Sequence, residues 1–252
     1  MRFAGALSLT LVLALLAGCG NDGETKTVTV RETVTATSSV PSEAPALVTL
    51  YFLREGKVAP ELRGIVSQPN IATVTLDQLF EGAESDLTTA IPTETRFKLA
   101  IDGGVASIEL TPPLDDPEAR AQILYTLTQF DTIQRVSFDD EQAVGRADFE
   151  QQTPAIFVEA PLPSEEVESG FEASGTANTF EANFQYELKD AAGKILTENF
   201  VTATSGNGTR GTFRFTVPYE IDRPQQGSLV VFESSAADGS RINEVTIPLE
   251  LG

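Results

Sequence analysis

The sequence predicts an α+β (or α/β) domain followed by an all-β sandwich, and three observations support this prediction. From Leu47 to Phe138, apolar residues alternate in some runs and recur at helical spacing in others, which indicates strands mixed with helices. Beyond Thr153, short alternating runs lie between glycine-containing turns, as in an antiparallel sandwich. The chain also has 41% hydrophobic residues and 15 phenylalanines, which are enough to fill packed cores.

A mostly apolar run from Phe3 to Leu16 precedes these domains, and Arg2 is the only basic side chain before it. A membrane-spanning helix needs about 20 apolar residues, so the run better fits the apolar part of an export signal. The run leads into Leu16-Ala17-Gly18-Cys19, and Cys19 is the only cysteine of the chain. The alternative is an ordinary signal peptide, or a short buried helix with an incidental cysteine.

This tetrapeptide resembles the lipobox of bacterial lipoproteins, in which a leucine and two small residues precede an obligatory cysteine. The resemblance implies a signal peptide over residues 1–18 and cleavage between Gly18 and Cys19. It also implies a diacylglyceryl group on the Cys19 sulfur and acylation, for example with palmitate, of the new amino terminus. Because two acyl chains anchor a protein stably, we expect attachment to the extracytoplasmic face of the cell membrane.

Residues 19–46 are expected to comprise the lipidated cysteine and a tether rich in threonine and serine. Thr27-Val28-Thr29-Val30 alternates like a strand, but no hydrophobic second face, turn signal or partner run is evident nearby. The composition therefore favours a linker that separates the domains from the membrane.

The first domain is expected over residues 47–150. Strands are predicted at residues 48–53, 62–66, 95–101, 106–110 and 136–138, with a tight turn at Asp102-Gly103-Gly104. Thr75 followed three residues later by Gln78 resembles a capping box, which predicts a helix that begins there and ends at Gly82.

A second helix is predicted to begin at Asp116-Pro117, because an acceptor side chain at the cap and a proline in the first turn favour a helix start. Ile123, Leu124, Leu127 and Phe130 recur at helical spacing and supply its buried face. Polar residues on the same helix could form a binding stripe, but we expect an exposed helix face. They are Tyr125, Thr126, Thr128 and Gln129.

Three runs in this domain resemble the GerM N-terminal domain of sporulation and germination lipoproteins, which also occurs in bacteria that make no spores. They are Val48-Thr49-Leu50-Tyr51-Phe52, Leu87-Thr88-Thr89-Ala90-Ile91-Pro92 and Gln122-Ile123-Leu124-Tyr125-Thr126-Leu127-Thr128-Gln129-Phe130. The resemblance extends over residues 47–149 and implies architecture more than activity. Some proteins of this type carry the domain twice, whereas one copy is evident in this chain.

The second domain is expected over residues 154–252. Seven short strands are predicted, at residues 156–158, 170–175, 182–188, 195–203, 211–217, 228–233 and 245–251. Phe184, Tyr186 and Leu188 alternate inward, and Asp190-Ala191-Ala192-Gly193 is a turn signal. This pattern is typical of an immunoglobulin-type sandwich, although the cysteine pair and tryptophan of antibody domains are missing.

The same region resembles the immunoglobulin-like domain of bacterial spore germination proteins, which commonly follows a GerM-type domain. The matching runs are Ser174-Gly175-Thr176-Ala177, Phe180-Glu181-Ala182, Leu188-Lys189-Asp190 with Gly193, Gly211-Thr212-Phe213, and Val231-Phe232-Glu233-Ser234-Ser235 with Asp238-Gly239.

The residue inventory excludes several classes of site. The net charge is -20, so nucleic acids and anionic lipid surfaces would be repelled. Histidine is absent, which removes Ser-His-Asp and Cys-His catalysis and the usual zinc sites. The sequence also lacks a phosphate-binding glycine loop and a dinucleotide fingerprint.

Carboxylate clusters are the remaining candidates for acid–base catalysis or for calcium binding. They are Asp115-Asp116, Asp139-Asp140-Glu141 and Glu165-Glu166. We interpret the first as helix capping and the other two as solvated loop acids, so no catalytic or metal-binding residue is predicted. Asn207-Gly208-Thr209 matches a glycosylation triplet, but Asn-Gly favours a turn.

We therefore expect a non-enzymatic, lipid-anchored interaction or assembly protein of the cell envelope. Its expected partners are the membrane, through the anchor, and an envelope protein or the cell wall, without nucleic acid and without a cofactor. The resemblance adds a link to sporulation or germination. A peptidoglycan- or carbohydrate-binding module is the alternative, and a cell-wall hydrolase is a less favoured one.

Overall fold

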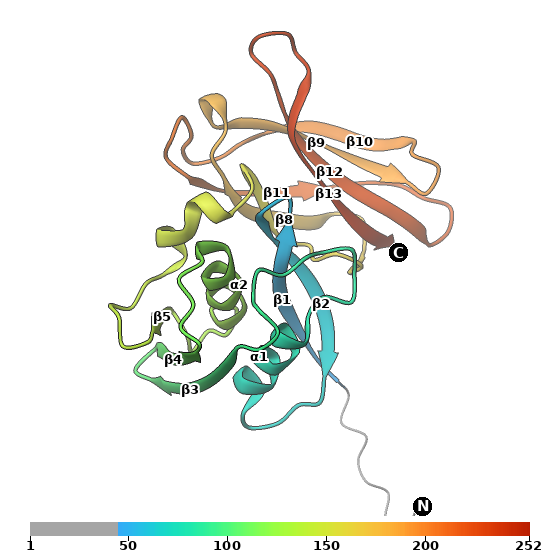
Figure 1. Cartoon of the computed structure of the whole chain (residues 1–252). Helices are drawn as coiled ribbons and strands as arrows, with labels where there is room; N and C mark the ends of the chain where they lie inside the picture. Colours follow the sequence, from blue (N-terminus) through green and yellow to red (C-terminus); the bar gives the residue numbers. More distant parts are fainter. Residues whose placement is uncertain (1–44) are drawn as a thin grey trace, which may run out of the picture. The chain divides into compact units, whose positions relative to one another are not determined.

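A computed structural model describes residues 45–252 (Figure 1). The predicted signal peptide, the lipidation site at Cys19, the cleavage position at Gly18 and nearly all of the tether lie outside the described residues. No helix within residues 45–252 is long and apolar enough to span a bilayer.

The N-terminal region combines strands and helices, as predicted. Its elements are β1 (Ala46–Arg54), β2 (Lys57–Ile65), α1 (Ile71–Glu81), β3 (Arg96–Asp102), β4 (Val105–Thr111), α2 (Pro117–Leu127), β5 (Arg135–Phe138) and the 3-10 segment η1 (Arg146–Gln152). Strands β1 and β2 form an antiparallel hairpin. A separate sheet has the order β3-β4-β5, in which β4 and β5 run parallel.

Turn residues position these strands. Gly103 and Gly104 both have positive φ between β3 and β4, which confirms the predicted tight turn. Glu55 and Gly56 have positive φ at the tip of the β1–β2 hairpin, a combination typical of a two-residue turn.

The predicted start of α1 is wrong. The helix begins at Ile71 after Asn70, so Thr75 lies in its interior, where it is buried and its hydroxyl donates to the Ile71 carbonyl at 2.8 Å. A threonine can satisfy its hydroxyl in this way inside a helix, and Ile71 and Ala72 extend the apolar face by one turn. The predicted end at Gly82 is confirmed, since Gly82 is the C-cap with a φ of 102°.

The predicted start of α2 is confirmed. Asp116 is the N-cap, and its Oδ1 accepts hydrogen bonds from the backbone amides of Glu118 at 2.8 Å and Ala119 at 3.1 Å. Pro117 occupies the first helical position, where a missing amide proton carries no penalty.

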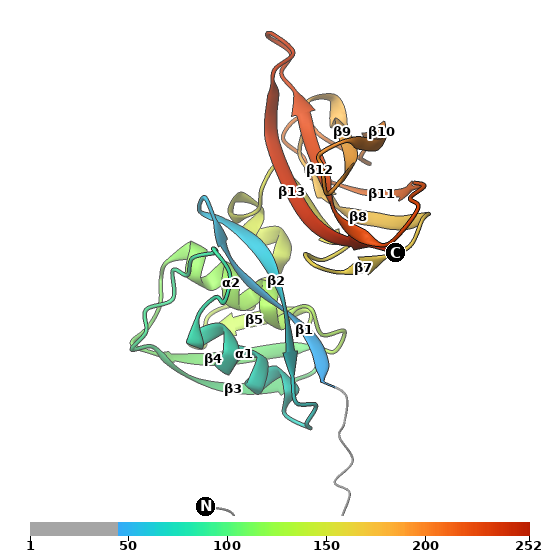
Figure 2. The same ribbon diagram turned by 90° about the vertical axis from the view of Figure 1, so that its right-hand side faces the viewer.

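The C-terminal region consists almost entirely of strands (Figure 2). They are β6 (Ile156–Ala160), β7 (Glu166–Val167), β8 (Phe171–Ala177), β9 (Asn183–Asp190), β10 (Ile195–Thr202), β11 (Gly211–Val217), β12 (Gln225–Ser234) and β13 (Arg241–Leu251), with the short 3-10 turn η2 (Phe180–Ala182). One sheet has the order β10-β9-β12-β13-β7 and the other has the order β11-β8-β6. Buried residues from both sheets form one cluster, as expected for a sandwich. The predicted fold class is therefore confirmed.

Two hydrophobic clusters meet on strand β6. Ile156 and Val158 belong to the cluster of the sandwich, whereas Phe157 belongs to the cluster of the N-terminal region. Successive side chains of a strand point to opposite faces, so one strand contributes to both cores. Gly175 of β8 permits this arrangement, because a Cβ there would lie 2.0 Å from the Phe157 carbonyl oxygen. The predicted domain limits at residues 150 and 154 stay a prediction.

Candidate functional site

The acidic pair Asp115-Asp116 and its neighbour Glu141 have structural contacts. Asp116 caps α2, and Asp115 forms an ion pair of 3.2 Å with Arg120. Glu141 accepts two hydrogen bonds from Arg120, at 2.9 and 3.0 Å, and these lower the pKa of its carboxyl. These side chains therefore hold the start of α2 against the loop after β5.

The remaining candidate acids are Asp139, Asp140, Glu165 and Glu166. Asp139 accepts the Leu110 amide at 2.7 Å, and both Asp139 and Asp140 have positive φ. Glu165 accepts the Leu162 amide at 2.7 Å, whereas Glu166 is exposed on β7. Among residues 45–252, no three acidic side chains are placed to hold a metal ion together. Asn207 and Gly208 have positive φ in a turn, as predicted.

The prediction of an exposed polar face on α2 is wrong. Tyr125 is 4% exposed and Thr126 is fully buried, while Thr128 and Gln129 are partly buried after the helix end. The Thr126 hydroxyl accepts the Tyr51 amide at 3.0 Å. Gln129 forms two hydrogen bonds of 2.7 Å with the backbone amide and carbonyl of Thr49.

Gln122 extends this arrangement and was not singled out from the sequence. Its Nε2 donates to the Tyr51 carbonyl at 3.2 Å, and its Oε1 accepts the Ala90 amide at 2.8 Å. Leu53 then exchanges two backbone hydrogen bonds with Thr88. Side chains on α2 and just after its end thus form hydrogen bonds with the backbone groups at the edge of β1, where a third strand would otherwise pair. The available signal was their spacing, since residues 122 and 126 share one helix face and residue 129 follows just beyond the helix end.

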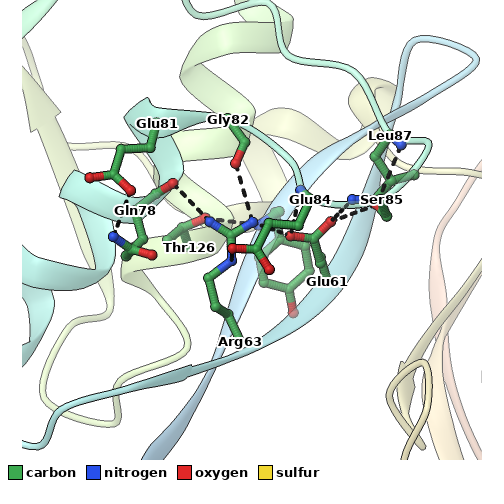
Figure 3. Close-up of polar contacts among 10 residues, drawn as sticks. Glu61, Arg63, Gln78, Glu81, Gly82, Glu84, Ser85, Leu87 and Thr126 are labelled. Atoms are coloured by element: carbon green, nitrogen blue, oxygen red, sulfur yellow. Dashed lines mark hydrogen bonds and ion pairs between the residues drawn. The ribbon is translucent and has the colours of Figure 1, made fainter.

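A second polar cluster surrounds the buried Arg63 of β2 (Figure 3). Its guanidinium donates to the carbonyls of Gln78 at 3.3 Å and Gly82 at 3.2 Å, both at the end of α1. It also pairs with Glu61, and it lies 5.8 Å from the ring centroid of Phe52. A cation at this position complements the negative end of the helix dipole.

Glu61 connects this cluster to the loop that follows α1. Its carboxylate accepts the backbone amides of Glu84 at 3.3 Å and Ser85 at 3.1 Å, together with the Ser85 hydroxyl (Figure 3). Burial raises the pKa of the Glu61 carboxyl, but the hydrogen bonds from Ser85, Glu84 and Arg63 outweigh it, so the pKa is lowered. Arg63 and Glu61 therefore fix the loop that leads to Thr88 at the edge of β1.

A third cluster surrounds Phe157 where the two hydrophobic clusters meet. The rings of Tyr51, Tyr125 and Phe157 contact one another, with centroid distances of 5.5, 6.2 and 5.6 Å. The guanidinium of Arg146 lies 4.7 Å from the Tyr125 ring centroid and pairs with Glu159 of β6. Burial is the main cause that raises the pKa of the Tyr125 hydroxyl to about 12.

The outer face of the five-stranded sheet carries a charged network and exposed apolar residues. Glu187 of β9 pairs with Arg241 and, at 3.0 Å, with Lys189; the hydrogen bond from Arg241 is the main cause of its lowered pKa. Arg241 also lies 3.9 Å from the ring centroid of Phe232 and covers that side chain. Phe200 on the edge strand β10 is 73% exposed.

A cavity of about 470 Å³ lies beside strands β2, β6 and β13. Its lining includes the apolar residues Val58, Phe157 and Val245 and the charged residues Glu55 and Glu244. Each of these strands has a single neighbour along most of its length in the described sheets, so the cavity lies next to strand edges.

Comparison with known families assigns both regions. Residues 49–142 match the family model described as sporulation and spore germination, and residues 155–240 match the model described as immunoglobulin-like domain of bacterial spore germination. The two regions thus match these two family models in the order that the sequence resemblance predicted. The three runs behind the first resemblance meet in the network of Gln122, Thr126 and Gln129 against β1 and Ala90.

Comparisons with solved structures and with curated proteins give no further assignment. The crystal structure of CopC from Methylosinus trichosporium OB3b has 15% sequence identity and covers 38% of this chain and 89% of that chain. Its TM-score is 0.24, too low to support any argument. The comparison with curated proteins found no match.

Proposed function

We propose that this chain is a lipid-anchored, non-catalytic interaction or assembly protein of the cell envelope that serves sporulation or germination. The observation that carries the proposal is the pair of family matches, in order, within one chain. Both families are described by a link to spore germination, and neither description names a reaction. The sequence motif ending at Cys19 supplies the anchor in this proposal.

The acidic side chains support a non-catalytic role. A hydrolase needs two carboxyl groups that face a shared substrate position. Here Asp116 caps a helix, Asp139 holds the Leu110 amide and Glu141 is paired with Arg120. These groups are thus committed to neighbouring protein atoms. The unpaired strand edges and the exposed Phe200 are, in contrast, features suited to contact with another protein.

The anchor is tested by replacing the cysteine. Cys19→Ser removes the only thiol that can accept a diacylglyceryl group, so the protein is expected to leave the membrane fraction while residues 45–252 stay folded. The measurement is membrane fractionation combined with metabolic labelling by a radioactive fatty acid. Label on the Cys19→Ser protein, or its unchanged retention in membranes, would refute the proposed anchor.

The interaction role is tested in cells. Cross-linking of the full chain in intact cells, followed by identification of attached proteins, is expected to recover a specific envelope protein. Purified sacculi provide the alternative partner in a parallel co-sedimentation assay. Binding to sacculi without any protein partner would replace the assembly role by wall binding.

A further inference from the structure

Strand β13 has one edge that is only partly paired. It pairs with β12 from Arg241 to Leu251 apart from an irregularity at Asn243 and Glu244, and on its other side it pairs with β7 only at Glu250 and Leu251. Residues 243–247 of β13, which lie before that short pairing, line the cavity of about 470 Å³.

The hydrogen bonds of Pro248 and Glu250 show which backbone groups of β13 point away from β12. The Glu250 amide donates to the Glu165 carbonyl, and the Pro248 carbonyl accepts the Ser164 amide, so both residues direct backbone groups away from β12. Backbone groups alternate along a strand, and the β12–β13 register is continuous from Val245 to Leu251. Thr246 therefore directs its amide and carbonyl away from β12, at the edge beside the cavity.

We propose that this edge accepts an extended, positively charged segment of a partner polypeptide as an added strand that pairs with Thr246. This inference rests on the proposed interaction role and assigns the partner-binding surface to this edge of β13. A main-chain donor and acceptor side by side recognise another extended backbone. The apolar residues Val58, Phe157 and Val245 line the space for alternate side chains of the added strand.

The net charge of the chain favours a basic segment as the added strand. The local charges lining the cavity balance, because Arg54 and Lys57 accompany Glu55 and Glu244. Moreover, Arg54 is paired with Asp86 at 3.1 Å and Glu244 with Arg241 at 3.6 Å. The net charge of -20 then sets the long-range field, which repels a second copy of this chain and attracts a basic segment.

The test uses the full chain in detergent and a short fluorescent peptide of alternating lysine and valine as the probe. Thr246→Pro removes the outward amide, and Pro248 shows that β13 tolerates proline at a position facing the same edge. We expect binding to weaken about tenfold, the effect of losing one or two backbone hydrogen bonds. Thr246→Ala is the matched control, because it keeps the amide and should bind like the original.

Two further probes separate strand addition from general attraction of a basic peptide. The same peptide with N-methylated backbone amides should bind at least about tenfold more weakly to the unaltered protein, and alternating glutamate and valine should also bind weakly. Equal binding of the methylated peptide, or equal binding to Thr246→Pro, would overturn the inference. The methylated probe tests it even if Thr246→Pro does not fold.

A photo-cross-linking amino acid in cells distinguishes this inference from the proposed function. The inference expects a partner to be captured from position 244, beside the cavity, and not from position 200 on β10. Capture from position 200 alone would refute the docking edge and leave the interaction role standing. Capture from neither position, together with no partner in the general cross-linking, would refute both.

Discussion

At the residue scale, Arg63 shows how one buried cation can hold several segments together. Its guanidinium contacts two carbonyls at the end of α1 and the carboxylate of Glu61, whose own hydrogen bonds fix the loop at Ser85. A buried charge is tolerated only when such partners replace water. Arg54 is the surface counterpart, because its pair with Asp86 is exposed on both sides.

The first prediction compares the stability contributed by the buried Arg63 with that contributed by the exposed Arg54. Arg63→Met keeps most of the side-chain volume but leaves the Glu61 carboxylate without its cation, so the free energy of unfolding should fall by about 3–5 kcal/mol. Arg54→Met should change it by less than about 1 kcal/mol. Urea denaturation followed by circular dichroism measures both values. Equal effects of the two substitutions would show that the Arg63 cluster is not a stabilising centre.

At the element scale, helix α2 satisfies one edge of a two-stranded hairpin. An isolated hairpin is marginally stable, and its unpaired edge is open to other strands. Gln122, Thr126 and Gln129 supply donors and acceptors to Thr49 and Tyr51 of β1. The helix thereby takes the place of a third strand with side chains in place of backbone groups.

The second prediction follows from the burial of this contact. Thr126→Val keeps the shape of the side chain and removes the acceptor of the Tyr51 amide, so a buried donor is left without a partner. The expected loss of stability is about 1–3 kcal/mol, with faster hydrogen exchange at the Tyr51 amide. The exposed Thr132→Val is the matched control and should be nearly neutral. Unchanged exchange at Tyr51 in Thr126→Val would contradict the edge-capping role.

At the scale of the whole molecule, strand β6 contributes side chains to both hydrophobic clusters. Phe157 packs between Tyr51 and Tyr125, while its neighbours Ile156 and Val158 pack in the sandwich. Glu159 on the same strand pairs with Arg146. Displacing β6 would therefore disturb both cores, so residues 45–252 should unfold cooperatively as one unit.

The third prediction tests this coupling. Phe157→Ala removes a buried aromatic ring, so it should lower the free energy of unfolding by about 3–5 kcal/mol and speed hydrogen exchange in both regions. The control Phe200→Ala removes an exposed ring and should have a small effect. Native-state hydrogen exchange, read separately for α2 and β9, measures the outcome. Faster exchange in α2 alone would mean that the two clusters are energetically independent.

Local signals accounted for most of the elements. Alternation located most strands of both regions, but the short strand β7 was not predicted and β2 begins at Lys57, five residues before the predicted start. The positive φ of Gly103, Gly104 and Gly193 matches the predicted turns. Asp116 was identified as a cap because its effect depends only on the next few residues. The start of α1 was missed at Thr75, since a capping pattern does not reveal whether the preceding residues are also helical.

The candidate site was far less predictable. Tyr125, Thr126 and Gln129 were expected on an exposed face because polarity along a helix normally indicates solvent. Their partners on β1 lie about 75 to 80 residues away in the chain, so no local pattern contains them. Gln122, Arg63 and Glu61 were missed for the same reason, since the partners of each lie in other segments of the chain.

The sequence by itself determined the fold class, the two family resemblances and the predicted lipid-attachment motif at Cys19, because these depend on periodicity, turn residues and short contiguous runs. Only the tertiary structure decided how polar side chains of α2 satisfy β1, how β6 contributes to two cores, and where an edge of β13 stays open beside a cavity. These features depend on hydrogen bonds and packing between segments far apart in the chain, which local residue patterns do not encode.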